Sequence, residues 1–137
     1  MTNKETDKFL SLVVLSYPSA YRNASEEVIE ATSRMWQNTF ARVPYRIMEL
    51  AFDRFRRKSK FPPTVAEMHE ALQDLHLQAK ADSLVSAAMG DLETQKKAMY
   101  IAQQTESFRD YNGDFLPINY RAISERDIKE LPGEEKE

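Results

Sequence analysis

The sequence predicts an all-α protein, a compact bundle of four to five helices followed by a weakly structured C-terminal tail. Apolar side chains recur at spacings of three and four over most of residues 7–104, the period of an amphipathic helix. Prolines and capping residues punctuate this stretch where one helix ends and the next begins. After residue 105 the periodicity weakens. We therefore expect a helical domain over 1–105 and a flexible acidic segment over 106–137 that becomes ordered on a partner.

Composition excludes several classes of protein. With 42% apolar and 30% charged residues in a chain of 137, we expect one globular domain. The longest apolar run, Leu12 to Leu15, is far shorter than the ~20 residues of a membrane span. The polar start, Thr2 to Lys8, lacks the apolar core of a secretion signal, so we expect a cytoplasmic protein. The absence of cysteine excludes disulfide scaffolds, cysteine-ligated metals and thiol nucleophiles.

Charge is spread unevenly along the chain, whose net charge is -3. Residues 1–60 hold 11 Lys and Arg against 7 Asp and Glu, whereas residues 61–137 hold 8 against 15. Such a two-ended distribution bears on partners and solubility rather than on fold.

Two helices are expected before residue 42. Thr6 or Asp7 could cap the first, and Pro18 ends it at Tyr17, because the residue before a proline is pushed out of the helical region. Ser25 opens the second, with two acids in its first turn. Its apolar face is expected to comprise Val28, Ile29, Thr32, Met35, Trp36 and Phe40. Trp36 in this setting is more typical of a core than of a stacking surface.

Pro44 suits the first turn of a third helix, where its missing N–H costs nothing. The apolar side of this helix carries Ile47, Met48, Leu50, Ala51, Phe52 and Phe55. We expect Trp36, Phe40, Leu50 and Phe55 to be buried. The run Phe61-Pro62-Pro63 then breaks the helix. Phe61 is expected to fill the core while the two prolines set the angle to the next helix.

Thr64 and Glu67 have the spacing of a capping box and predict the start of a fourth helix. It can run to Met89, with Gly90 as its stop. A fifth helix is expected over residues 91–104. Beyond it, Asn112-Gly113 suits a two-residue turn and hence a small hairpin, and residues 124–131 could form a last short helix.

No pattern of catalytic or cofactor-binding residues emerges, and we expect neither an enzyme nor a cofactor. His69 and His76, the only histidines, are seven residues apart, whereas helical zinc sites use a spacing of four. Carboxylates such as Glu67 and Glu70 are typical of solvated helix faces. The glycine-rich loops that cradle nucleotide phosphates are absent, which separates this chain from helicase loaders that are themselves ATPases.

The sharpest electrostatic feature is a basic cluster at the expected end of the third helix. It comprises Arg54, Arg56, Arg57, Lys58 and Lys60. These cations could grip phosphates or an acidic protein surface. Alternatively, they only complement the negative end of a helix and aid solubility.

One stretch of the chain resembles a known family. Trp36, Val43-Pro44-Tyr45 and Ser59-Lys60-Phe61-Pro62-Pro63-Thr64, followed by Glu67, resemble the small phage replicative helicase loader and inhibitor proteins. The resemblance covers about residues 5–75 and is strongest over 36–68, and 106–137 match no motif of the family. It implies a helical adaptor, not an enzyme, that binds a DnaB-type hexameric helicase in a bacterial host, restrains it and delivers it to an origin-bound initiator.

The resemblance also implies that the C-terminal region grips the helicase. From residue 106 onward the chain holds 9 Asp and Glu against 5 Lys and Arg, with apolar residues between them. Such a segment can fold on a partner and bury its anchors. The predicted anchors are Phe108, Tyr111, Phe115, Leu116, Ile118, Tyr120, Ile123, Ile128 and Leu131.

Two other interpretations remain open at this point. The protein could be a small helical nucleic-acid-binding replication or regulatory protein that uses the basic cluster, or a purely structural interaction module. Because the chain is acidic overall, we expect no tight direct binding to DNA.

Overall fold

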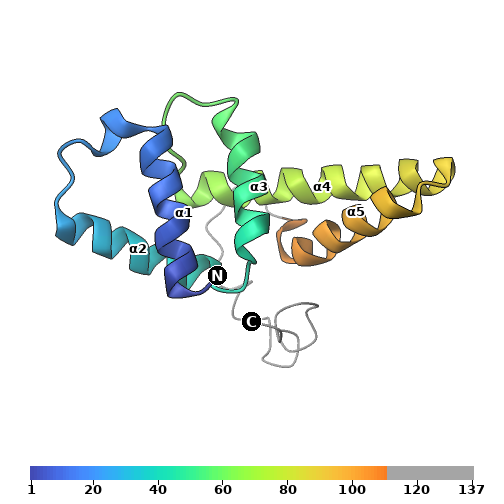
Figure 1. The fold of residues 1–137 in the computed structure, drawn as a ribbon, viewed down its shortest axis with the longest axis horizontal. Coiled ribbons are helices and arrows are strands. Elements are labelled where there is room, and N and C mark those ends of the chain that lie inside the picture. Colours follow the sequence, from blue (N-terminus) through green and yellow to red (C-terminus); the bar gives the residue numbers. More distant parts are fainter. Residues whose placement is uncertain (111–137) are drawn as a thin grey trace. The chain divides into compact units, whose positions relative to one another are not determined.

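The computed structural model describes residues 1–110, of which 78% are helical, and no strand occurs among them (Figure 1). The predicted all-α class and the number of helices are confirmed. The helices are α1 (Asn3–Ser16), η1 (Pro18–Tyr21), α2 (Glu26–Phe40), α3 (Tyr45–Arg56), α4 (Val65–Met89), α5 (Leu92–Gln104) and η2 (Glu106–Phe108). No helix in this part of the chain combines the length and apolar character that crossing a bilayer requires.

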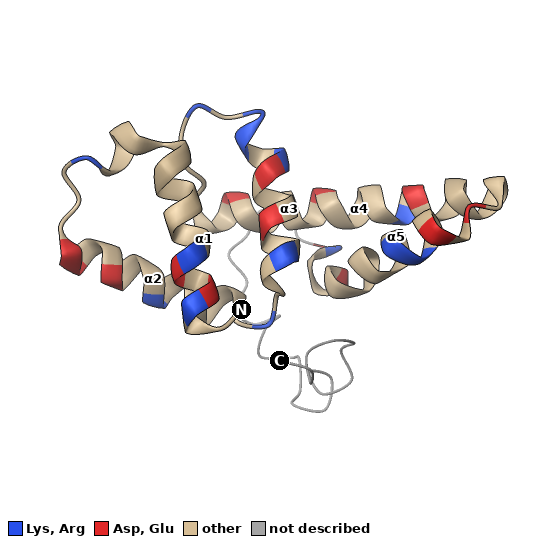
Figure 2. Cartoon of the chain, viewed as in Figure 1, with Lys and Arg blue, Asp and Glu red and all other residues tan. Residues whose placement is uncertain are grey.

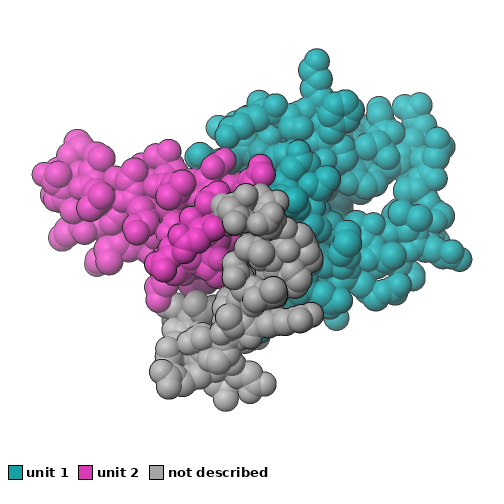
Figure 3. Space-filling model, turned by 180° about the vertical axis from the view of Figure 1, so that it is seen from behind, with its two compact units in different colours: residues 1–68 teal, residues 69–137 magenta. Residues whose placement is uncertain are grey.

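The chain forms two compact units, which Figure 3 colours separately, and the division falls early in α4. Unit 1 is residues 1–68 and unit 2 begins at His69. The predicted turn at Asn112-Gly113 and the predicted helix over 124–131 lie outside the described residues. The division into a helical domain over 1–105 and an acidic segment over 106–137 therefore stays a prediction.

Helix α1 begins four residues before the predicted caps. Thr2 and Glu5 form a capping box, in which the Thr2 hydroxyl accepts from the Glu5 N–H at 3.1 Å and the Glu5 carboxylate accepts from the Thr2 N–H at 2.8 Å. The expectation that Thr6 or Asp7 caps this helix is wrong. Thr6 is instead fully buried, and its hydroxyl donates to the side-chain amide oxygen of Gln37 on α2.

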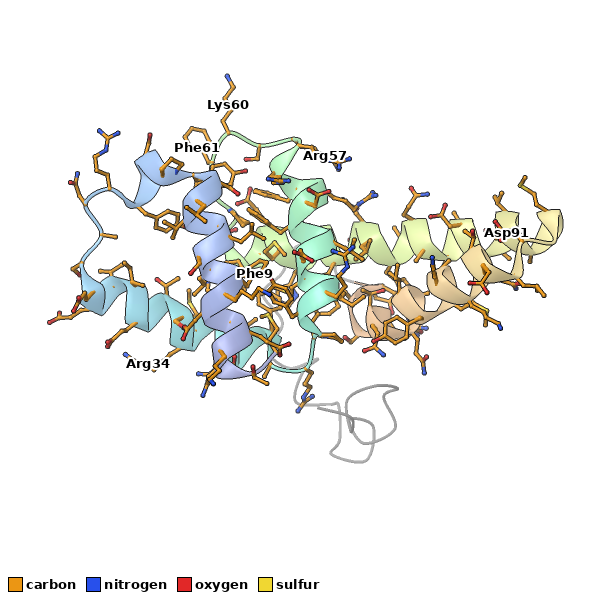
Figure 4. All side chains as sticks on the ribbon, in the orientation of Figure 1. Phe9, Arg34, Arg57, Lys60, Phe61 and Asp91 are labelled. Carbon is orange, nitrogen blue, oxygen red and sulfur yellow. The ribbon has the colours of Figure 1, made fainter. Side chains whose placement is uncertain are left out.

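The core of unit 1 is a chain of aromatic rings. Phe9 of α1 lies 5.7 Å from Trp36 and 5.6 Å from Phe52 between ring centroids, and Trp36 lies 5.3 Å from Phe40. All four rings are at most 4% exposed, which confirms the predicted burial of Trp36 and Phe40. Figure 4 shows Phe9 pointing into this cluster from α1.

The predicted apolar face of α2 is only partly buried. Val28, Ile29 and Met35 are 56%, 44% and 50% exposed. The reason is visible in Figure 1: α2 crosses α1 only near its C-terminal end, so its first turns have no helix of unit 1 beside them. On α3, Leu50 and Phe55 are half-buried rather than buried, since Ile47, Met48, Ala51 and Phe52 supply the core.

Helices α4 and α5 form an antiparallel hairpin in unit 2 (Figure 1). The predicted stop at Gly90 is confirmed, because Gly90 has a positive φ of 73° and closes a Schellman motif. In this motif the Asp91 N–H donates to the Ser86 carbonyl at 2.9 Å and the Gly90 N–H donates to the Ala87 carbonyl at 3.2 Å. Asp91 then caps α5 by accepting from the Thr94 N–H.

Candidate functional site

The basic cluster lies at the C-terminal end of α3 and in the loop that follows (Figure 2). Two of its cations are partly neutralised, because Arg56 and Arg57 both donate to the carboxylate of Asp53 at 2.9 Å. Arg54 is half-buried, whereas Lys58 and Lys60 are exposed. Figure 4 shows Lys60 pointing away from unit 1. The structure thus brings the predicted cluster together, with its accessible charge reduced by Asp53.

The loop between α3 and α4 presents Phe61 beside this cluster. The prediction that Phe61 fills the core is wrong, since its side chain is 75% exposed (Figure 4). Tyr17 takes the place beneath the loop: its ring lies 6.3 Å from Phe52, and its hydroxyl donates to the Ser59 carbonyl at 3.0 Å. Pro63, rather than Phe61, is the buried residue of the corner.

The capping box at the start of α4 is confirmed. The Thr64 hydroxyl accepts from the Glu67 N–H at 3.1 Å, and the Glu67 carboxylate accepts from the Thr64 N–H at 2.9 Å. These two bonds fix where the loop ends and therefore hold the exposed Phe61 and Lys60 in place. The corner is at once a structural joint and an accessible surface.

A hollow of about 280 Å³ lies on the surface of unit 1 where α1 meets α3. Its floor is apolar and its rim carries two ion pairs, Arg46 with Glu49 and Arg56 with Asp53. The lining residues are Leu12, Arg46, Glu49, Leu50, Phe52, Asp53 and Arg56. Sequence reasoning missed it, and the signal available was Leu50, an apolar residue left half-buried on an otherwise well-packed helix.

Most of the predicted helicase anchors lie outside the described residues, namely Tyr111, Phe115, Leu116, Ile118, Tyr120, Ile123, Ile128 and Leu131. Phe108 is described: it is 3% exposed, belongs to η2 and packs on the His69 ring at 5.3 Å. In this conformation Phe108 contributes to the core of unit 2. A role for these residues in binding a partner stays a prediction.

Both histidines are buried in unit 2. Burial lowers the pKa of His69 from 6.5 to about 4. The Nδ1 atom of His76 lies 2.9 Å from the Ala102 carbonyl and 3.0 Å from the Thr105 hydroxyl, so this ring joins α4 to α5. Within residues 1–110, no three His, Asp or Glu side chains gather as a metal site would require.

The family model for the N-terminal domain of the phage helicase loader/inhibitor protein matches residues 1–69 of this chain. The chain belongs to this loader/inhibitor family. The match covers half of the chain, and it ends within one residue of the boundary between units 1 and 2. Unit 1 is therefore this chain's form of the loader/inhibitor N-terminal domain.

The residues that carry the resemblance to helicase loaders all lie inside the family match. Trp36 is in the aromatic core, and Pro44 and Tyr45 open α3, where the Lys8 ammonium lies 4.9 Å from the Tyr45 ring centroid. Ser59 to Thr64 form the corner between α3 and α4. In the loader/inhibitor domain these residues thus build the scaffold, with Lys60 and Phe61 as its exposed part.

Members of the family are phage helicase loaders and inhibitors that act in DNA replication, and they bind a replicative helicase. No curated protein matches this chain. No solved structure matches it either. The family match extends to residue 69, so unit 2 and everything after it must be interpreted from its own residues.

Proposed function

We propose that this protein is a non-enzymatic adaptor that binds a DnaB-type hexameric helicase, restrains it and delivers it to an initiator at a phage replication origin. The observation that carries the proposal is the match of the whole of unit 1 to the loader/inhibitor N-terminal domain. The residues after unit 1 supply what an adaptor needs beyond that domain. They add a helical hairpin and an acidic segment rich in apolar anchors.

The proposed grip is the segment from residue 106 onward. Its apolar residues would become buried on the helicase, and its acids would suit a basic groove between helicase subunits. Unit 1, with its basic cluster and exposed Phe61, is left for the second partner, the initiator. An adaptor built this way can hold both proteins at once.

The test compares the full chain with a variant carrying Ile123→Asp, Ile128→Asp and Leu131→Asp. The matched control is Leu15→Asp, which puts the same charge on a 78% exposed leucine of α1. We expect the full chain and the control to bind purified DnaB-type helicase of the phage or its host and to slow its strand unwinding. The triple variant should lose both effects. Binding that survives in the triple variant would place the grip elsewhere.

A second function is favoured by the basic cluster, which could contact nucleic acid phosphates. The pairing of Arg56 and Arg57 with Asp53 counts against it, because an acid among the cations weakens attraction for phosphate. We therefore rank it below helicase binding and give its test at the scale of the whole molecule in the Discussion.

A further inference from the structure

The hairpin of α4 and α5 is held together by small and polar side chains. Among the residues buried along it are Ala79 and Ser86 on α4 and Ala98 and Thr105 on α5. The larger apolar side chains point outward instead: Leu77, Leu84, Leu92 and Met99 are 54%, 74%, 65% and 54% exposed. Single exposed leucines are ordinary, but several on one hairpin mark a surface that is covered in use.

These four side chains share one face. Successive helical residues are rotated by about 100°, so a residue directly after a buried seam residue lies on one flank of the helix. Leu77 follows His76 and Leu84 follows Ser83 on α4, and Met99 follows Ala98 on α5 with Leu92 one heptad earlier. In an antiparallel pair, the flanks that follow the seam lie on the same side. We call this surface, Leu77, Leu84, Leu92 and Met99, the leucine face.

The leucine face carries positive charge only. By the same rule Lys80, which follows Ala79, and Lys96, which follows Gln95, lie on it, and none of its positions is acidic. A second copy of the chain docking face to face would oppose lysines to lysines, which is unfavourable. The charge instead selects an acidic, apolar segment.

The chain itself supplies such a segment. Residues 111–137 contain seven acids against four bases, and Tyr120, Ile123, Ile128 and Leu131 would fall on one side of a helix. A helix over residues 120–131 would be about 18 Å long, and residues 77–88 of α4 span about 17 Å. The lengths of the surface and of the segment therefore agree.

The tether permits the contact. The Gln73 side-chain amide donates to the Arg109 carbonyl at 2.9 Å, so the segment starts about one helical turn before Leu77. The nine residues 111–119 can extend to ~30 Å, which is more than the distance needed to reach any part of the leucine face. Docking within one chain also has a high effective concentration and needs little affinity.

We propose that residues 120–131 dock as an amphipathic helix on the leucine face of the α4–α5 hairpin, so that the free protein covers its own helicase anchors. Resting on the proposed function, this contact makes helicase binding a competition: Tyr120, Ile123, Ile128 and Leu131 are either on the hairpin or on the helicase. The free adaptor is thereby held in a closed state that the helicase must open.

Hydrogen exchange on the full chain tests the docking without any helicase. The test variant is Leu84→Glu and the control is Val85→Glu. Val85 is adjacent in sequence and 57% exposed, but it precedes the buried Ser86 and so lies on the opposite face. We expect exchange over 120–131 to be slowed about tenfold in the natural sequence and in Val85→Glu, and to be fast in Leu84→Glu.

Random-coil exchange over 120–131 in the natural sequence would overturn the docking, as would equal protection in both variants. Unchanged exchange together with a dimer that Leu84→Glu dissociates would assign the face to a second copy instead. Both variants leave the seam intact, so protection within α4 and α5 reports whether the hairpin is still folded.

Helicase affinity then tests the competition separately. If about nine-tenths of the free protein is closed, Leu84→Glu should bind the helicase about tenfold more tightly, the same factor by which exchange was slowed. Weaker binding by Leu84→Glu would make the leucine face a helicase contact and overturn the competition. If no variant binds helicase, the proposed function fails while the docking still stands on the exchange data.

Discussion

At the scale of single residues, the stability of unit 1 depends on a few rings that touch one another. Trp36 lies between Phe9 and Phe40, at 5.7 and 5.3 Å, and is 4% exposed. Aromatic pairs at such distances contribute beyond the area they bury. A substitution at this position therefore removes two ring contacts as well as a large buried surface.

Trp36→Ala should lower the free energy of unfolding by about 3–5 kcal/mol, because it leaves a cavity that the neighbouring rings fill only in part. Urea denaturation measures it. The adjacent Met35→Ala is the control, since Met35 is 50% exposed and should change stability by less than ~0.5 kcal/mol. A loss below about 1 kcal/mol in Trp36→Ala with an intact fold would show that the ring is not part of the core.

His69 should make the stability pH-dependent. Burial lowers its pKa to about 4 against 6.5 in the unfolded chain, so the unfolded state binds the proton first as the pH falls. Stability from this group is full above pH 6.5, declines below it and levels off below pH 4. Between about pH 7 and pH 5 the loss should be about 2 kcal/mol. Urea denaturation should show it in the natural sequence and not in His69→Gln; identical losses in both would contradict the assignment.

At the scale of elements, the helices are delimited by their own caps. Thr2 with Glu5 and Thr64 with Glu67 are capping boxes, and Ser25 and Asp91 each accept from an N–H three residues on. The hairpin of unit 2 depends on Gly90, whose φ of 73° is in the left-handed region. A Cβ at Gly90 would meet nothing within 4 Å, so only backbone strain opposes a side chain there.

Gly90→Ala should therefore cost about 1–2 kcal/mol through strain alone. Gly90→Asn should cost less, because asparagine adopts the left-handed region more readily. Thermal unfolding of the two variants measures the difference. Equal losses in both variants would mean that the space around residue 90, rather than its φ angle, limits substitution.

At the scale of the whole molecule, the charge is divided along the sequence. The surplus of cations in residues 1–60 includes the cluster that ends α3, and the surplus of acids lies beyond (Figure 2). A chain with a net charge of -3 is repelled by nucleic acid over most of its surface. Only a short basic surface, already paired in part with Asp53, opposes that repulsion.

Duplex DNA should accordingly bind only in the non-specific range, with Kd of about 10⁻⁴ to 10⁻⁶ M at physiological salt. Arg57→Ala with Lys60→Ala should reduce the slope of log K against log salt by about 2, whereas Arg34→Ala on α2 should change it by no more than one contact. Fluorescence anisotropy measures both. Nanomolar binding that the double variant abolishes would favour the nucleic-acid-binding interpretation.

Sequence alone determined where the helices lie and which family the first half belongs to. The caps at Ser25 and Thr64, the stop at Gly90 and the start of α5 depend on hydrogen bonds and φ angles within a few residues, so their signals are local. The burial of Trp36 and Phe40 was also predictable, because large aromatic residues at helical spacing are rarely left outside.

Only the tertiary structure decided which side of each helix meets a neighbour. Phe61 is exposed because Tyr17, more than forty positions earlier, occupies the space beneath the corner. Val28 and Ile29 are exposed because α2 crosses α1 only at its far end. The leucine face exists because the α4–α5 seam is made of small residues and leaves the large ones outside. Each outcome depends on packing between segments distant in sequence, which apolar periodicity along one helix does not specify.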